Sequence, residues 1–315
     1  MERLPHNHDM RFAVIGAGGV GGYFGGKLAH GGADVVFIVR GKTLDALRTN
    51  GLRVDSINGD FVLPQVNATD DPKAAGPVDV VLLAVKTSQI PEVLESIAPL
   101  IGNETAVIPL ENGMDAPEQI AAAVGREHAM GGLCAIVSFI VAPGHIHHAA
   151  SDPFLMFGEL DNAKSERVIR IAEAMKAAGI NADVPPDIHK SMWTKFLFIA
   201  PLSGIGAVTR VPTGVWRAMP EIRDIARRAL DEIVALAAAR GVELGADAVD
   251  VTMSRYDGLA PEATSSLQRD IMQGKRSELE AQLGAVVRMG RESGIATPIH
   301  EMLYAMLLPQ ERMAK

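Results

Sequence analysis

Runs of apolar residues alternate with segments of helical spacing through the first part of the chain. Short, almost entirely apolar runs occur in Arg11–Gly16, Val35–Val39, Val78–Val85 and Ala106–Leu110, and helical spacing occurs in Val20–His30, Gln89–Leu100 and Ala116–Val124. Such apolar runs are typical of parallel strands that are buried on both faces. The alternation predicts an α/β fold with a Rossmann-type, doubly wound parallel sheet.

The pattern changes between Ile136 and Gly158, where we expect shorter strand-like pieces that break at Pro143-Gly144 and at Asp152-Pro153. A helix over Ser165–Ala178 and a short strand near Ile180–Val184 are expected to follow. Pro185-Pro186 then interrupts the chain, because proline cannot continue a strand ladder or a helix interior. We therefore expect the Rossmann domain to span residues 10–184.

Residues 185–315 have the pattern of an all-helical domain. Apolar residues recur at helical spacing in Ile188–Ala200, Ile222–Arg240, Ala246–Asp257, Ser277–Glu292 and Ile299–Leu308. The polar residues 1–9 lack the apolar core of a secretory signal, and we expect a disordered tail there.

Composition narrows the range of partners and compartments. The 315-residue chain has a formal net charge of −8 and no block of Lys or Arg, so nucleic acid and anionic membrane surfaces are poor partners. No apolar run reaches the roughly 18 residues of a membrane span. The sequence has one cysteine, Cys134, which cannot form an intramolecular disulfide. These features favour the cytoplasm.

A glycine-rich turn follows the first predicted strand. Its residues, Gly16-Ala17-Gly18-Gly19-Val20-Gly21, match G-x-G-x-x-G between a strand and a helix, which is the context of a dinucleotide-binding turn. Gly16 would permit the turn, Gly18 would let the backbone approach a pyrophosphate, and Gly21 would let the helix pack on the sheet. The helix N-terminus would then bind the phosphates. A glycine turn without a ligand is the alternative.

The ends of the predicted strands carry further candidates. Arg40 stands where NAD-binding chains tend to place Asp or Glu, and its guanidinium suits a ribose 2′-phosphate, which predicts NADPH. A solvated arginine is the alternative. Lys86 and Asn112 also follow strands, where open α/β sheets bind ligands, so both are expected to contact cofactor or substrate. For Asn112, an Asn-Gly turn without a ligand is equally compatible with the sequence.

Six short motifs along the chain carry a family resemblance. Together with Arg40, they are the glycine turn, Val85-Lys86-Thr87-Ser88-Gln89, Glu111-Asn112-Gly113-Met114, Trp193-Thr194-Lys195-Phe196-Leu197, Ser265–Asp270 and Lys275–Glu280. From Met10 onward the chain resembles the ketopantoate reductase (2-dehydropantoate 2-reductase) family. The resemblance implies a Rossmann domain, a helical C-terminal domain, an active site between them, and reduction of ketopantoate to pantoate with NADPH.

The resemblance also implies roles for three residues of the helical half. The family's catalytic lysine matches Lys195, whose ammonium would stabilise the charge that hydride transfer builds on a carbonyl oxygen and would donate the proton. The substrate-orienting glutamate matches Glu278, and the substrate-binding serine matches Ser266. The residues alone also allow a lysine at a helix edge, a glutamate at a helix start and a capping serine.

Two positions depart from the family's pattern. Members usually carry Asn four and eight residues after the catalytic lysine, where this sequence has Ile199 and Ser203. On a helix both positions share a face with Lys195, so we expect both to face the substrate. Ile199 would suit a more apolar 2-oxo acid than ketopantoate. The missing Asn also argues against other β-hydroxyacid dehydrogenases of similar fold.

A metal site is not expected. His145 and His147 would share one face of an extended strand within His145-Ile146-His147-His148, but no Cys or carboxylate stands beside them at ligand spacing. The family implied by the resemblance needs no metal.

The combination of candidates favours an enzyme over a non-catalytic NADPH-binding regulator. A regulator would keep the glycine turn and lose the acid, whereas Lys195, Glu278, Ser266 and Asn112 are present together. Apolar faces in the helical domain would allow a homodimer.

Overall fold

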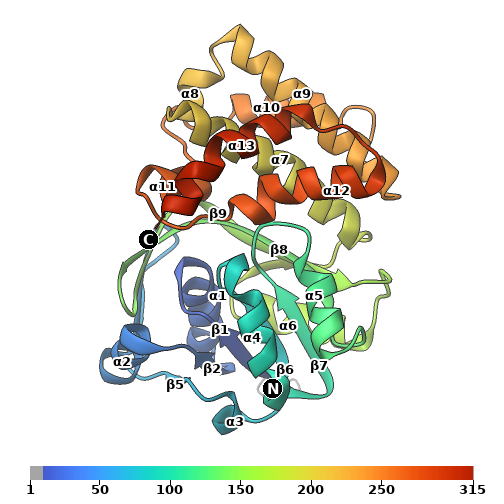
Figure 1. Cartoon of the computed structure of the whole chain (residues 1–315). Coiled ribbons are helices and arrows are strands. Elements are labelled where there is room, and N and C mark those ends of the chain that lie inside the picture. The colour runs from blue at the N-terminus through green and yellow to red at the C-terminus, as the bar shows by residue number, and fades with distance from the viewer. Residues whose placement is uncertain (1–9, 315) are drawn as a thin grey trace, which may run out of the picture. The chain divides into compact units, whose positions relative to one another are not determined.

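The computed structural model describes residues 10–314, which fall into two units (Figure 1). The first unit comprises the chain up to Glu111 together with Ala116–Ile188, and the second comprises Asn112–Asp115 and the chain from His189 onward. The division follows Ile188, close to the prolines at which the sequence predicts a boundary. A short loop from the first half, Asn112–Asp115, groups with the helical unit. The expected tail at 1–9 lies outside the described residues.

A five-stranded parallel sheet, in the order β5-β2-β1-β6-β7, forms the centre of the first unit. Its strands are β1 (Arg11–Ile15), β2 (Asp34–Ile38), β5 (Asn67–Thr69), β6 (Val78–Leu83) and β7 (Ile101–Pro109). β1 pairs with β2 on one side and with β6 on the other, so the chain order reverses between β1 and β6. Such a reversal marks the ligand crevice of open α/β sheets. The parallel sheet confirms the predicted α/β class.

Both faces of this sheet are buried, as its apolar runs predict. Phe12 and Val14 of β1 belong to one apolar cluster with α1 (Gly19–His30), whereas Ala13 and Ile15 belong to another cluster on the opposite face. The second cluster includes α4 (Ile90–Ser96) and α5 (Ala116–Val124). Shorter elements of this unit are α2 (Gly41–Asn50), α3 (Pro72–Ala75), η1 (Thr87–Gln89) and η2 (Ala98–Leu100).

A second, mixed sheet belongs to the same unit: the sequence predicts strands within 136–158 and 180–184, but neither the strands β3 and β4 nor the pairing of all these strands in one sheet. It consists of β3 (Leu52–Ser56), β4 (Phe61–Leu63), β10 (Asn181–Asp183) and the long hairpin of β8 (Met130–Ala142) and β9 (His145–Glu159). Pro143-Gly144 forms the hairpin turn, where a break was expected. The expected break at Asp152-Pro153 is wrong, because β9 continues through a bulge there. The β8–β9 register shifts at this point and Ser151 has a φ of 62°, so the proline meets no regular ladder.

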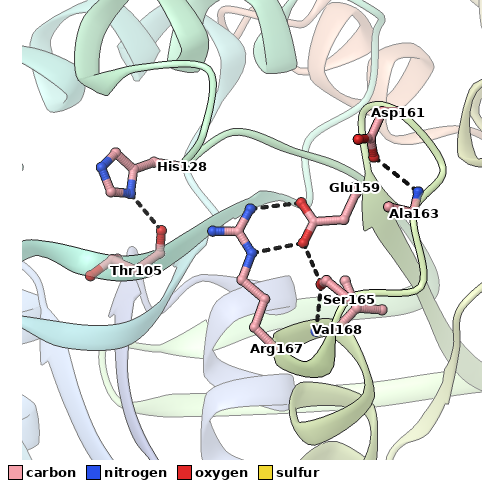
Figure 2. Close-up of polar contacts among 8 residues, drawn as sticks. All are labelled: Thr105, His128, Glu159, Asp161, Ala163, Ser165, Arg167 and Val168. Carbon is pink, nitrogen blue, oxygen red and sulfur yellow. Dashed lines mark hydrogen bonds and ion pairs between the residues drawn. The ribbon is translucent and has the colours of Figure 1, made fainter.

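The helix α6 (Glu166–Ala177) is anchored to the end of β9 by Glu159 (Figure 2). The Glu159 carboxylate accepts two hydrogen bonds from Arg167, at 2.7 and 2.6 Å, and one from the Ser165 hydroxyl at 2.6 Å. The bond to Glu159 raises the pKa of Arg167. Ser165 also accepts from the backbone nitrogen of Val168 at 3.3 Å and so caps α6. The helix therefore begins where the sequence predicts it.

The second unit is helical, which confirms the predicted all-helical C-terminal part. Its elements are α7 (Ile188–Thr209), α8 (Thr213–Trp216), α9 (Pro220–Ala239), α10 (Ala248–Asp257), α11 (Ser266–Met272), the π-helix η3 (Glu280–Gly284), α12 (Ala285–Ser293) and α13 (Pro298–Met313). An apolar cluster that includes Trp193, Leu230, Tyr256 and Leu303 forms its core.

Helix α7 is longer than predicted, because it continues through Pro201 to Thr209. The Tyr256 hydroxyl donates to the backbone oxygen of Phe198 at 2.7 Å, in the turn before this proline. With this extension α7 has the length and the apolar composition that a membrane-spanning helix needs. This corrects the expectation that no apolar segment is long enough to span a membrane. However, 67% of its most apolar window is buried inside the fold, as in the core helix of a helical unit.

Candidate cofactor and substrate sites

The glycine-rich turn has the backbone geometry that its sequence predicts. Gly16 has a φ of 89°, and a Cβ there would lie 2.7 Å from the backbone oxygen of Ala84. A Cβ on Gly21 would overlap the Gly16 oxygen and lie 2.9 Å from the Ala84 Cβ, so glycine is needed for the helix to pack this closely. A Cβ on Gly18 would meet only Ile140 Cδ1, at 3.7 Å. The backbone at Gly18 is therefore open to a ligand.

The N-terminus of α1 presents backbone donors at this turn. Gly18 is the N-cap, and no side chain within residues 10–314 caps the helix. Uncapped N–H groups and the helix dipole together suit a phosphate. Nothing in the sequence pattern indicates that Ser138 lies near this turn. Its Oγ lies 2.7 Å from the position of a Cβ on Gly19, because the β8 hairpin passes beside the turn.

Arg40 lies just after β2, at the N-cap of α2, and its guanidinium forms an ion pair with Glu92 of α4. The two side chains are 61% and 64% exposed, so a ligand can reach the pair. An exposed ion pair of this kind contributes about 0–1 kcal/mol to stability. A phosphate dianion can therefore replace Glu92 as the partner of the Arg40 guanidinium. Glu92 could not be found from the sequence, because it is 52 residues from Arg40 and belongs to no motif.

Lys86 and Glu111 lie beyond the ends of β6 and β7. The strand β6 ends at Leu83, so the prediction that Lys86 directly follows a strand is wrong: Lys86 is the N-cap of η1, where its backbone nitrogen donates to Gln89 Oε1 at 3.1 Å. The buried Glu111 carboxylate accepts from the backbone nitrogens of Val85, at 3.3 Å, and Leu110, at 3.1 Å. It therefore ties these two strand ends together immediately before Asn112.

Asn112 and Glu278 are in contact within the helical unit. Asn112 Nδ2 donates to Glu278 Oε2 at 3.0 Å and joins segments 166 residues apart. Gly113 has a φ of 115°, and a Cβ there would lie 2.8 Å from the backbone oxygen of Ala281. The Asn-Gly loop thus fits closely against η3. The structure brings together two of the residues that the sequence singles out.

Lys195, Ile199 and Ser203 occur at four-residue intervals in α7, so they share one side of the helix. Lys195 and Ile199 are half-buried, and Ser203 is fully buried. Ile199 packs against the apolar core of the unit. Phe196 and Leu197, beside the lysine, are each 1% exposed. Their burial fixes the rotation of α7 and keeps Lys195 at the edge of an apolar core.

Ser266 is exposed at the first residue of α11. The N-cap is its neighbour Ser265, whose side chain accepts from the backbone nitrogen of Gln268 at 3.0 Å. The capping alternative for Ser266 is therefore wrong. Contact with a substrate stays a prediction for this hydroxyl.

The histidines of β9 connect strands of the second sheet. His145 Nε2 lies 2.7 Å from Asp55 Oδ2, and His148 Nδ1 lies 2.9 Å from Ser56 Oγ, both on β3. Arg53 and His145 lower the pKa of the Asp55 carboxyl by hydrogen bonding to it. Within residues 10–314 no group of three or more His, Cys, Asp or Glu side chains could hold a metal ion.

Comparison with known proteins gives matches along almost the whole chain. The family model described as ketopantoate reductase PanE/ApbA matches residues 12–162, and the model of its C-terminal part matches residues 187–311. A 2-dehydropantoate 2-reductase of Nostoc sp. is 30% identical over 305 residues, which cover 95% of each chain. An oxidoreductase of Bacillus subtilis, YkpB, whose name calls it uncharacterized, is 32% identical over 95% of this chain and 98% of its own.

Solved structures show the same relationship. The crystal structure of 2-dehydropantoate 2-reductase from Geobacter metallireducens has a TM-score of 0.89 and 31% identity, and covers 95% of this chain and 99% of its own. A D-mandelate dehydrogenase structure shares the fold, with a TM-score of 0.88, 22% identity and coverage of 96% of this chain and 99% of its own.

Proposed function

Since the chain belongs to the ketopantoate reductase family, whose members are oxidoreductases that use NAD(P)H, we propose that it reduces a 2-oxo acid to a 2-hydroxy acid with NADPH. The observation that carries the proposal is the Asn112–Glu278 hydrogen bond in the unit that contains Lys195. This hydrogen bond holds two polar side chains from distant parts of the chain next to each other. A substrate with two adjacent polar groups needs such a pair of side chains. The first substrate to consider is 2-dehydropantoate, whose reduction yields pantoate for pantothenate and coenzyme A synthesis.

Each site residue then has a chemical role. Lys195 stabilises the negative charge that grows on the substrate's 2-oxo oxygen and gives that oxygen a proton. Glu278, positioned by Asn112, orients the substrate, and Ser266 donates a hydrogen bond to it. Ile199 and Ser203, on the Lys195 side of α7, complete the substrate contacts.

The first unit fits a dinucleotide, because Gly18 is open to a ligand and the first turn of α1 has no side-chain cap within residues 10–314. The backbone of Gly16-Ala17-Gly18-Gly19-Val20-Gly21 would bind the pyrophosphate, Arg40 the 2′-phosphate, and Lys86 and Asn112 the nicotinamide half. Bound NADPH supplies the hydride. We further propose that the enzyme acts in the cytoplasm as a homodimer and needs neither metal, nucleic acid nor membrane.

A second candidate substrate is a 2-oxo acid more apolar than ketopantoate. Ile199 favours it, since a branched apolar side chain stands where the family usually has an amide. The amide's loss would leave a substrate polar group unpaired, at a cost of about 1–3 kcal/mol.

Steady-state kinetics with NADPH and a set of 2-oxo acids test both candidates. A kcat/KM for ketopantoate above about 10⁴ M⁻¹s⁻¹ and higher than for every bulkier or more apolar acid would support ketopantoate. In that case Ile199→Asn should bring no gain on ketopantoate. Absence of turnover with every acid would contradict the proposed reaction and favour a non-catalytic NADPH-binding protein.

A further inference from the structure

Both ends of the Asn112–Asp115 loop have a polar contact within the helical unit. Asn112 Nδ2 donates to Glu278 Oε2 at 3.0 Å, and Asp115 Oδ2 accepts from Arg288 Nη2 at 2.5 Å. Glu278 lies just before the continuous helical stretch formed by η3 and α12, and Arg288 lies in α12. One helical segment therefore holds the loop at its first and at its last residue.

The two middle residues of the loop also pack against this unit. A Cβ on Gly113 would lie 2.8 Å from the Ala281 backbone oxygen, and the half-buried Met114 packs against the apolar core. So close a fit leaves the loop little room to move without a change in the distance between Asn112 and Glu278. The position of Asn112 therefore depends on how well the rest of the loop is anchored.

Packing of α12 fixes the direction of the Arg288 side chain. Its two sequence neighbours are at most 5% exposed, so the rotation of the helix is set by the core. The guanidinium also lies 3.6 Å from Glu280 Oε1 and 3.9 Å from Glu292 Oε1. Both distances are longer than the 2.5 Å to Asp115, so the loop carboxylate has the closest contact with this arginine.

This ion pair is expected to contribute little to folding. The Arg288 and Asp115 side chains are 40% and 36% exposed, and exposed ion pairs contribute no more than about 1 kcal/mol to stability. The position of a group that meets a substrate matters more, because a displacement of about 1 Å can cost about 100-fold in rate. Loss of the pair should therefore affect the reaction more than it affects the fold.

Building on the proposed function, we propose that Arg288 and Asp115 are positioning residues for the reduction of the 2-oxo acid. Their ion pair fixes the end of the loop and so keeps Asn112 in contact with Glu278, where both side chains can meet the substrate. Neither member of the pair needs to touch the substrate itself. Loss of the pair should therefore raise the KM for the 2-oxo acid and change kcat less.

Two substitutions of Asp115 separate this role from a structural one. Asp115 directly precedes α5, where a side chain could cap the helix. Asp115→Asn keeps a good N-cap and removes the charge, whereas Asp115→Glu keeps the charge and is not a preferred N-cap. Asp115→Asn should lower kcat/KM by about 10-fold, mainly through KM, with the Tm within about 2 °C of the wild type. Asp115→Glu should stay within about threefold of the wild-type kcat/KM. A capping role would reverse this order.

Substitution of the arginine tests the other side of the pair. Arg288→Met should raise KM as Asp115→Asn does, and the double variant should be no worse than either single variant, because both remove the same interaction. Arg291→Met is the matched control: Arg291 lies three residues further along α12, is 72% exposed and pairs with Glu301 instead of the loop. In all these variants the Kd for 2′,5′-ADP should stay unchanged, since its proposed contacts belong to the first unit.

The outcomes distinguish this inference from the proposed function. If the wild-type enzyme reduces no 2-oxo acid, the proposed function fails and the positioning role fails with it. If the wild-type enzyme is active but Asp115→Asn keeps its KM, or if the effects of Asp115→Asn and Arg288→Met add, only the positioning role is overturned. An equal rise of KM in Arg291→Met would also overturn it, because general surface charge would then explain the effect.

Discussion

Arg40 and Lys195 are placed in different physical surroundings. Arg40 is mostly exposed and pairs with another exposed side chain. Lys195 is half-buried in α7, next in sequence to the buried Phe196 and Leu197. Exposed charges interact weakly in water but bind a multiply charged group well. A cation at the edge of an apolar core interacts more strongly with charge that develops beside it. Substitution of Arg40 should therefore act on binding, and substitution of Lys195 on the chemical step.

Lys195→Ala should lower kcat by about 10²–10⁴-fold and leave the Kd for NADPH nearly unchanged, because the lysine is the proposed proton donor. Fluorescence titration of NADPH and stopped-flow measurement of its oxidation check both parts. Lys176→Ala, at an exposed lysine of α6, serves as a control with wild-type kinetics. Near-normal turnover of Lys195→Ala would assign proton donation to another group, with Lys86 the next candidate.

Arg40→Ala should reduce the preference for NADPH over NADH by about 10–100-fold, since a charge-assisted bond to phosphate contributes about 1.5–3 kcal/mol. The measurement is kcat/KM with each cofactor. Equal kcat/KM values for the two cofactors in the wild-type enzyme, or an unchanged ratio in the variant, would remove Arg40 from cofactor selection.

Glu92→Gln should strengthen the binding of a 2′-phosphate, which is the opposite of the effect expected for Arg40→Ala. Glu92 occupies the guanidinium of Arg40 and repels a 2′-phosphate, so its neutral variant should bind 2′,5′-ADP about 3–10-fold more tightly, with little change for ADP. The gain should shrink at high ionic strength. Glu95→Gln, one turn further along α4 and also exposed, is the matched control. Equal effects of the two substitutions would mean that only general surface charge matters.

Among the elements, the turn between β1 and α1 combines two glycines with different constraints. Gly21 is constrained by the protein itself, since a Cβ there would overlap the Gly16 oxygen. Gly18 is not, because the nearest atom to a Cβ there is 3.7 Å away. The open space beside Gly18 matters only if a ligand approaches the backbone there. Substitutions at Gly18 and Gly21 can therefore distinguish effects on folding from effects on cofactor binding.

Gly18→Ala should keep the Tm of the free protein within about 1–2 °C of the wild type and weaken NADPH binding by about 10-fold or more, because the methyl group would occupy the space of the pyrophosphate. Gly21→Ala should lower both the Tm and the affinity. Thermal unfolding with and without NADPH measures these effects. An unaltered Kd in Gly18→Ala would show that the pyrophosphate binds elsewhere.

In the molecule as a whole, the candidate groups are divided between two units. The glycine turn and Arg40 belong to the first unit, whereas Asn112, Lys195, Ser266 and Glu278 belong to the helical unit. The proposed cofactor contacts are therefore mostly made by one unit and the proposed substrate contacts by the other. This division predicts that the cofactor stabilises the two units unequally.

Differential scanning calorimetry should show that NADPH at about 100 times its Kd stabilises the first unit by about 2.7 kcal/mol and the helical unit less. NADH at the same concentration should have a smaller effect, since it lacks the 2′-phosphate. A single transition that shifts as a whole would instead show that the two units unfold together.

The sequence by itself determined the features that depend on local chemistry. Apolar runs predicted the parallel strands, helical spacing predicted the helical unit, and the spacing of Gly16, Gly18 and Gly21 predicted a turn that the backbone geometry confirms. These features follow from backbone conformation and from periodicity over a few residues, both of which are visible in a short stretch of sequence. The strands β3 and β4 and the pairing of the second sheet were missed, because the pairing joins distant parts of the chain.

Only the tertiary structure decided which polar groups meet. The partners Arg40 and Glu92 are 52 residues apart, and Asn112 and Glu278 are 166 residues apart. No local pattern connects such residues, because their contact depends on how whole elements pack. The same holds for Asp115, whose ion-pair partner in α12 is 173 residues away. That pair forms only because packing sets the rotation of α12, and packing is a property of the folded chain.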